Sequence, residues 1–94
     1  MNKGDLLTLV QSNLDLLSVD KTRESQLNFL IDTAIELIAR EGVTLTEPYT
    51  SEDANLIVMY ASYLYRKRAT DEAMPRMLRW ALNNRIFGRN ADGT

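Results

Sequence analysis

The chain has 94 residues, which predicts a single domain over residues 1–94 with one modest core. It contains no cysteine and no histidine, which excludes disulfides, thiolate nucleophiles and imidazole chemistry. The net charge is −2, but residues 1–65 carry four basic groups against ten acidic ones, whereas residues 66–94 carry seven against three. This asymmetry is either scatter on a small surface or a molecule with an acidic end and a basic end, which would suit head-to-tail packing of identical copies.

Helical spacing of apolar residues dominates the sequence, and glycine and proline are rare. We therefore predict an all-α protein, a small bundle of four helices over about 4–14, 21–41, 51–69 and 75–88. The N-terminal residues lack the long apolar run of a signal peptide, and no stretch approaches the length of a membrane span. We expect a protein that is made and kept in the cytosol, with no membrane partner.

The second helix has the clearest boundary signals. Asp20 or Thr22 is its expected N-cap, and Gly42 is expected just after its last turn. Phe29 falls on the polar side of this helix. A single exposed phenylalanine has no special meaning in most proteins, but here it could also touch a neighbouring copy. The expected core face consists of Leu27, Leu30, Ile31, Ala34, Ile35, Leu37 and Ile38.

Residues 42–50 show no periodic pattern, and Pro48 interrupts them. We predict a mobile loop in which Tyr49 stands out as an aromatic residue. Thr50 or Ser51 should then cap the third helix.

Apolar residues cover most of the third helix, leaving a narrow polar strip of Asn55, Ser62 and Arg66. A helix that is apolar nearly all round is buried on several sides. That burial could require contacts from outside the chain, or its tyrosines could simply tolerate partial exposure.

The fourth helix should open at Pro75 and close at Gly88, followed by a flexible polar tail over 89–94. One face should join the core, whereas Trp80 and Phe87, seven residues apart, form a second apolar ridge roughly opposite it. The second ridge predicts a surface for another chain and an assembly protein. The expected core face consists of Met74, Leu78, Ala81, Leu82 and Ile86.

Nothing in the sequence indicates an active site, so we expect neither an enzyme nor a bound cofactor or metal. Asp32 and Glu36 lie four residues apart, but helical metal sites normally add Glu-x-x-His motifs, which are absent. Nucleic-acid binding is the more serious alternative, because the arginines of residues 66–89 could contact phosphates and Trp80 could stack on bases. Against it, the chain as a whole is acidic, with a pI of about 5.0.

The order of these segments resembles the head–tail connector family of tailed bacteriophages, also called adaptor, head-completion or DNA-packaging proteins. The likeness covers about residues 4–90. It is most telling in the tyrosine-rich stretch Ser-Glu-Asp-Ala-Asn-Leu-Ile-Val-Met-Tyr-Ala-Ser-Tyr-Leu-Tyr-Arg-Lys-Arg and in the later Met-Pro-Arg-Met-Leu-Arg-Trp-Ala-Leu-Asn-Asn-Arg.

The resemblance implies a virion neck protein that forms a ring, commonly of twelve copies, below the portal of the filled capsid. Genomic DNA would pass through the lumen, and a stopper or tail-completion protein would assemble on the ring. The C-terminal segment would reach the portal, which makes Arg85 to Thr94 the expected contact. The candidate subunit and portal interface residues are Phe29, Tyr49, Arg76, Arg79, Trp80, Arg85, Phe87 and Arg89.

Overall fold

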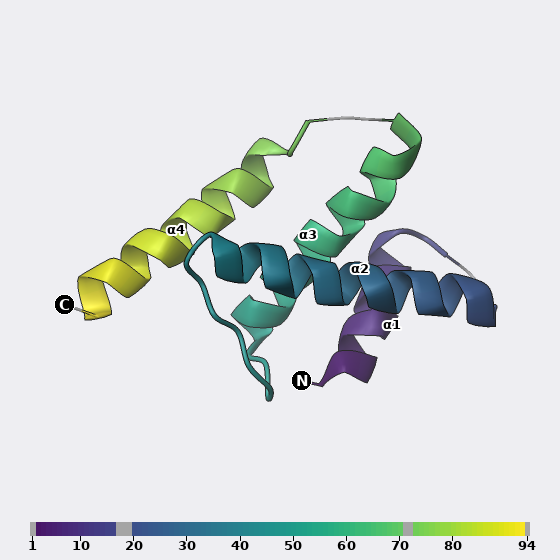
Figure 1. Ribbon diagram of the computed structural model, residues 1–94, viewed down its shortest axis with the longest axis horizontal. Coiled ribbons are helices and arrows are strands. Elements are labelled where there is room, and N and C mark those ends of the chain that lie inside the picture. Colours follow the sequence, from purple (N-terminus) through teal and green to yellow (C-terminus); the bar gives the residue numbers. More distant parts are fainter. Residues whose placement is uncertain (1, 17–19, 71–72, 94) are drawn as a thin grey trace.

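The computed structural model describes residues 2–16, 20–70 and 73–93, with side chains over 2–16, 20–68 and 73–87. Four helices account for most of these residues: α1 Lys3–Asn13, α2 Lys21–Arg40, α3 Ser51–Thr70 and α4 Arg76–Gly93 (Figure 1). The described residues contain no strand. The predicted all-α bundle of four helices is therefore confirmed. None of these helices combines the length and the apolar character that crossing a membrane requires.

Local capping explains where the helices begin. In α2, the Asp20 side chain accepts a hydrogen bond from the Arg23 N–H at 2.7 Å, which selects Asp20 over Thr22 as the N-cap. In α3, Thr50 and Asp53 form a reciprocal pair, in which each backbone N–H donates to the other residue's side chain at 3.2 and 3.1 Å. Gly42 follows α2 with φ of +108°, a backbone conformation that glycine adopts without strain.

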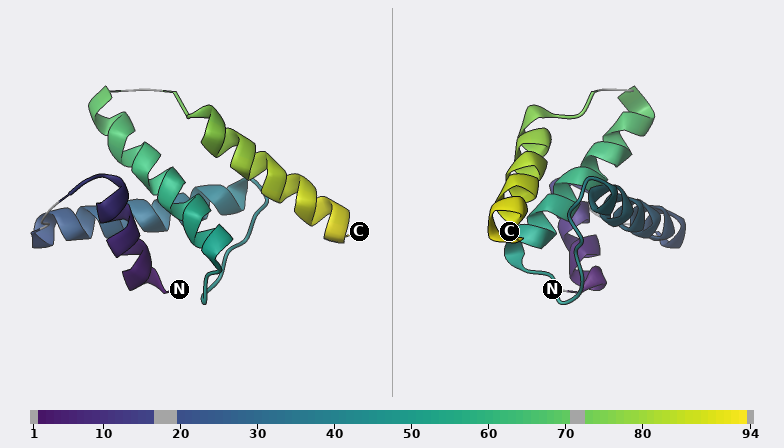
Figure 2. Two further views of the ribbon diagram at one scale, coloured as in Figure 1. Left: turned by 180° about the vertical axis from the view of Figure 1, so that it is seen from behind. Right: turned by 60° about the vertical axis from the view of Figure 1, so that its left-hand side comes forward.

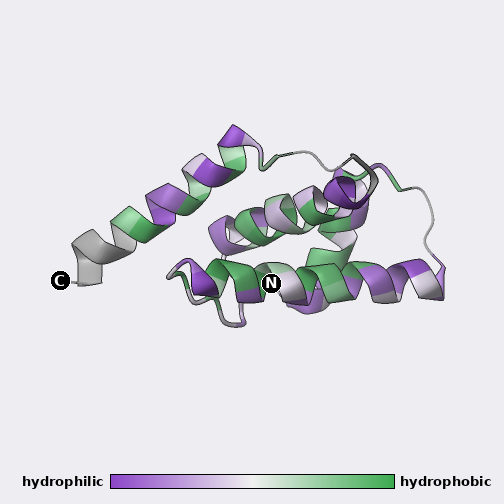
Figure 3. Cartoon of the chain, turned by 45° about the horizontal axis from the view of Figure 1, so that its top comes forward, coloured by the Kyte–Doolittle hydropathy of each residue, from purple (hydrophilic) through white to green (hydrophobic). Residues whose placement is uncertain are grey.

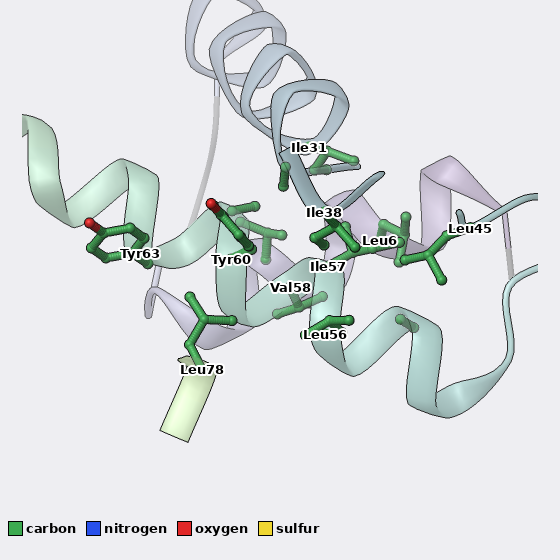
Figure 4. Close-up of a cluster of buried hydrophobic side chains, with 14 of the residues drawn as sticks. Leu6, Ile31, Ile38, Leu45, Leu56, Ile57, Val58, Tyr60, Tyr63 and Leu78 are labelled. Carbon is green, nitrogen blue, oxygen red and sulfur yellow. The ribbon is translucent and has the colours of Figure 1, made fainter. Parts of the chain in front are cut away.

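The third helix is the centre of the bundle, because α1, α2 and α4 all pack against it. Leu56, Ile57 and Tyr60 are buried among side chains from the other helices, as Figure 4 shows. Contacts within the chain thus explain why α3 is apolar nearly all round, and they require no second molecule. The buried side chains of the other three helices are Leu6, Val10, Leu27, Ile31, Ala34, Ile38, Leu78 and Leu82.

The prediction is wrong for one residue of the polar strip on α3. Ser62 is fully buried, and its Oγ accepts a hydrogen bond from Asn13 Nδ2 at 2.7 Å. A small hydroxyl can enter a core when a partner satisfies it. The polar strip is consequently narrower than predicted, and Ser62 faces α1 instead of water.

The segment between α2 and α3 forms no helix or strand, as predicted, but it is more than a connection. Val43 and Leu45 are buried in the core, whereas Thr44 between them is exposed. An extended backbone turns alternate side chains to the same side, so Val43 and Leu45 both reach the core and hold the segment against it. The Lys3 N–H also donates to Glu47 Oε1 at 3.2 Å, which ties the segment to the start of α1.

The prediction that the fourth helix ends at Gly88 is wrong. The helix begins at Arg76, directly after Pro75, and continues through Gly88 to Gly93. A glycine inside a helix costs roughly 1 kcal/mol relative to alanine, which weakens a helix without ending it. No proline follows to stop the helix. The backbone predicted as a polar tail is therefore part of α4, except for Thr94, which lies outside the described residues.

The fourth helix lies at the edge of the bundle, and its C-terminal end points away from the other helices (Figures 1 and 2). Among the described residues, α4 packs extensively against α3 alone. Figure 3 shows the same separation in a view coloured by hydropathy. One long side of α4 is thus turned away from the rest of the chain.

Candidate functional site

The outward side of α4 carries three large exposed apolar residues. Met77, Trp80 and Phe87 are 67%, 63% and 69% exposed, whereas Leu78 and Leu82 on the opposite side are almost completely buried. The predicted two-sided character of this helix is confirmed. We call the outward surface the α4 ridge and define it as Arg76, Met77, Trp80, Asn84 and Phe87, all of which are exposed.

Helical geometry places these residues together. Trp80 and Phe87 are seven residues apart, so two turns of helix return them to nearly the same direction. Met77 and Asn84 lie one turn before Trp80 and Phe87, respectively, at neighbouring positions on the surface. Clusters of large exposed apolar side chains are typical of interaction surfaces.

Arg79 and Arg85 are held by acidic residues of the same chain. Arg79 Nη2 lies 2.8 Å from Glu41 Oε2 at the end of α2. Arg85 Nη2 lies 2.7 Å from Asp53 Oδ1 in the first turn of α3. These two ion pairs fasten α4 to the bundle, so both arginines have a structural role in addition to any role at an interface.

The pair between Arg85 and Asp53 is the more buried one, with side-chain exposures of 32% and 13%. Burial by itself would raise the pKa of Asp53, but hydrogen bonds from Arg85 and Thr50 outweigh it and hold that pKa below its ordinary value of 3.8. Arg85 Nη1 is buried and finds no hydrogen-bond partner in the described part of the chain. The pair therefore stabilises the folded chain only while Asp53 is ionised.

Arg76 differs from these two arginines. Like Arg79 it is exposed, but it forms no ion pair with any other described residue. No described carboxylate therefore neutralises the charge of Arg76. The side chain of Arg89, the last predicted interface arginine, lies outside the described side chains.

The two remaining candidates lie on a different surface. Phe29 is 59% exposed on α2, and Tyr49 is half-buried beside the core. Burial, Glu47 and Asp32 all raise the pKa of Tyr49, which places its hydroxyl in an acidic neighbourhood. The structure thus separates the predicted residues into a group on α4 and a group around α2 and residues 42–50.

Two features of these surfaces are not identified by the sequence analysis. Met77 belongs to the exposed side of α4, and helical spacing from Trp80 could have revealed it. Lys3 links Asp32 to the segment that contains Glu47. Its Nζ lies 2.8 Å from Asp32 Oδ2, and its backbone N–H donates to Glu47. No local signal in the sequence indicates that second contact, because residues 3, 32 and 47 are distant along the chain.

No protein-family model, no curated protein and no solved structure matches this chain. A small helical protein with an exposed apolar ridge, and on it an arginine that forms no ion pair with the other described residues, has the properties of an interaction module.

Proposed function

We propose that this protein is a structural component of a tailed-phage virion, a head–tail adaptor that forms a ring below the portal. The ring would extend the channel for genomic DNA and provide the docking surface for a stopper or tail-completion protein. The observation that carries the proposal is the α4 ridge, where Met77, Trp80 and Phe87 are exposed together on one side of a helix at the edge of the bundle.

An adaptor needs surface for contacts with other chains. Aromatic residues, methionine and arginine are enriched at protein interfaces, and the α4 ridge contains all three kinds. The family resemblance over about residues 4–90 supports the same function, because connector proteins act through contacts between chains.

Nucleic-acid binding by a small regulator is the alternative function. It would use the arginines of residues 66–89 to contact phosphates. Arg85 is already held by Asp53 in a partly buried ion pair, so it offers less charge to a phosphate backbone than the sequence suggested. This favours the adaptor as the proposed function.

The adaptor function can be tested with DNA-filled capsids that carry the portal of the same virus but lack the neck. Wild-type protein should bind to these particles and form a ring that is visible in electron micrographs. Trp80→Ala should stay folded and fail to bind, because the substitution removes the largest apolar side chain of the α4 ridge.

Leu9→Ala is the matched control, since Leu9 is a partly exposed apolar residue on α1, outside the ridge. It should bind like the wild type. Normal binding of the folded Trp80→Ala variant would contradict the proposal, as would a wild-type chain that ignores the particles. Salt-sensitive retention of short duplex DNA, without binding to particles, would favour the regulator instead.

A further inference from the structure

The surface around Phe29 combines an exposed aromatic ring with acidic groups. Asp32 and Glu36 lie one and two turns after Phe29, on the same outward side of α2. Lys3 brings Glu47 to this surface, because its Nζ contacts Asp32 while its N–H donates to Glu47. We call this surface the α2 patch and define it as Phe29, Asp32, Glu36 and Glu47, all of which are exposed.

The ion pairs on the α2 patch are easily exchanged. The Asp32 side chain is 61% exposed in its pair with Lys3, and the Glu36 side chain is 65% exposed in its pair with Arg40. Exposed pairs of this kind contribute little to stability. The carboxylates can therefore accept a cation from a second molecule at little cost to the fold.

The α4 ridge has the opposite character. Residues 73–91 contain four arginines and no acidic residue, and the charge of Arg76 is not compensated within the described chain. Pairing two ridges with each other would bury their aromatic rings but would leave Arg76 without an acidic partner. Pairing a ridge with an α2 patch buries Trp80 and Phe87 and also provides carboxylates for Arg76.

A ridge and a patch of the same molecule cannot meet. The third helix packs against both α2 and α4, and it lies between them in the right-hand view of Figure 2. The α4 ridge faces away from α3, as does the outward side of α2 that carries Phe29. Each surface must therefore find its complement on another copy.

We propose that the α4 ridge of one copy docks on the α2 patch of a second copy. Each molecule then binds one neighbour through its ridge and another neighbour through its patch. The inference rests on the proposed function and specifies the subunit contact of the ring. It joins two different surfaces, and such a head-to-tail contact produces a closed ring or an open helical array.

Charge exchange tests which surfaces meet. Arg76→Glu would bring a carboxylate of the ridge against the acidic patch, and Asp32→Lys would bring an ammonium of the patch against the basic ridge. Each single variant should associate about tenfold more weakly than the wild type, because an attraction becomes a repulsion. The double variant Arg76→Glu/Asp32→Lys should recover association, as should an equimolar mixture of the two single variants.

Two exposed residues near the start of α2, outside the patch, provide controls with the same changes of charge. Lys21→Glu matches Arg76→Glu, and Glu24→Lys matches Asp32→Lys. Association is read as the increase of weight-average mass with concentration in sedimentation equilibrium, up to about millimolar protein, where weak contacts become populated. Circular dichroism checks that every variant is folded.

Loss of association in both single variants, recovery in the double variant and no effect of the controls would support the proposed contact. Equal effects of the ridge, patch and control variants would overturn it but leave the adaptor function standing, since the capsid-binding test is separate. Wild-type protein that stays monomeric at every concentration would also overturn this self-docking, whatever the capsids show. If the double variant still associates after Trp80→Ala is added to it, Trp80 is not buried in the contact, and the proposed role of the α4 ridge is contradicted.

Discussion

Replacement of Trp80 by alanine should have a small effect on the stability of the isolated chain. The residue is 63% exposed, so roughly a third of an aromatic side chain that can bury up to about 250 Å² is shielded. At about 25 cal/mol per Å² this corresponds to about 2 kcal/mol as an upper bound. The better helix propensity of alanine returns about 0.5 kcal/mol. We expect a net loss of about 1 kcal/mol, because α4 itself provides part of the shielding.

Leu82→Ala, two residues further along the same helix, provides the comparison. Leu82 is fully buried, so truncation removes transfer free energy and leaves a cavity, at a cost of about 3 kcal/mol. For a domain of this size, these losses correspond to melting temperatures lower by roughly 5 °C for Trp80→Ala and 15 °C for Leu82→Ala. Thermal unfolding followed by circular dichroism at 222 nm measures both. If Trp80→Ala costs as much as Leu82→Ala, the indole belongs to the core and the two-sided interpretation of α4 is refuted.

Three further predictions concern contacts that hold the bundle together. Asp53→Asn should lower the free energy of unfolding at neutral pH by about 2 kcal/mol, measured by urea titration, because it leaves the half-buried Arg85 without its counter-charge. Folding lowers the pKa of Asp53, so the contribution of its carboxylate to the free energy of unfolding is complete above the ordinary pKa of 3.8 and is lost as the pH falls through the lower folded pKa. The wild type should therefore lose this part of its stability in acid, whereas Asp53→Asn should not. Leu45→Ala should cost about 2 kcal/mol, since the side chain is buried, whereas an effect near zero would show that the segment before α3 is not packed. Ser62→Val should destabilise the chain by about 1 kcal/mol, because it removes the hydrogen bond from Asn13 and places a larger side chain at a fully buried position, and unchanged thermal stability would contradict this packing.

Most of the fold follows from local patterns in the sequence. The apolar period of α2 and its Asp20 and Gly42 boundaries locate that helix to within one residue of its observed end. Such signals depend on residues close together in the chain, and these are visible without a structure. The exposure of Trp80 and Phe87 is equally local, since it follows from their angle to Leu78 and Leu82 on one helix.

The errors arise where contacts between distant residues decide the outcome. Ser62 looks like a surface residue until Asn13 is seen to provide its hydrogen bond. Val43 and Leu45 form too short a pattern to be distinguished from a loop, because two apolar residues define no period. The error at Gly88 has a local cause instead: glycine often ends a helix, but here it weakens α4 without ending it, and the helix continues to Gly93.

The candidate surfaces could be predicted only in part. Trp80 and Phe87 were found from helical spacing, but the internal pairing of Arg85 with Asp53 joins residues 32 positions apart, and sequence patterns do not reveal it. The closeness of Asp32 to Glu47 likewise depends on how α1 meets the segment before α3. The ion pairs distinguish Arg79 and Arg85, which bind acidic residues of the bundle, from Arg76, which pairs with no described carboxylate.

The single tryptophan of this chain can report directly on whether the α4 ridge is covered by another molecule. Trp80 fluorescence can be recorded, with acrylamide quenching, for the dilute protein and then for protein bound to neckless, portal-bearing capsids. We expect red-shifted, readily quenched emission in the free chain and blue-shifted, protected emission in the assembly, because the α4 ridge is covered there. Protected emission in the free chain, or emission that is unchanged when the protein is bound, would contradict the claim that this side of α4 is made for another molecule.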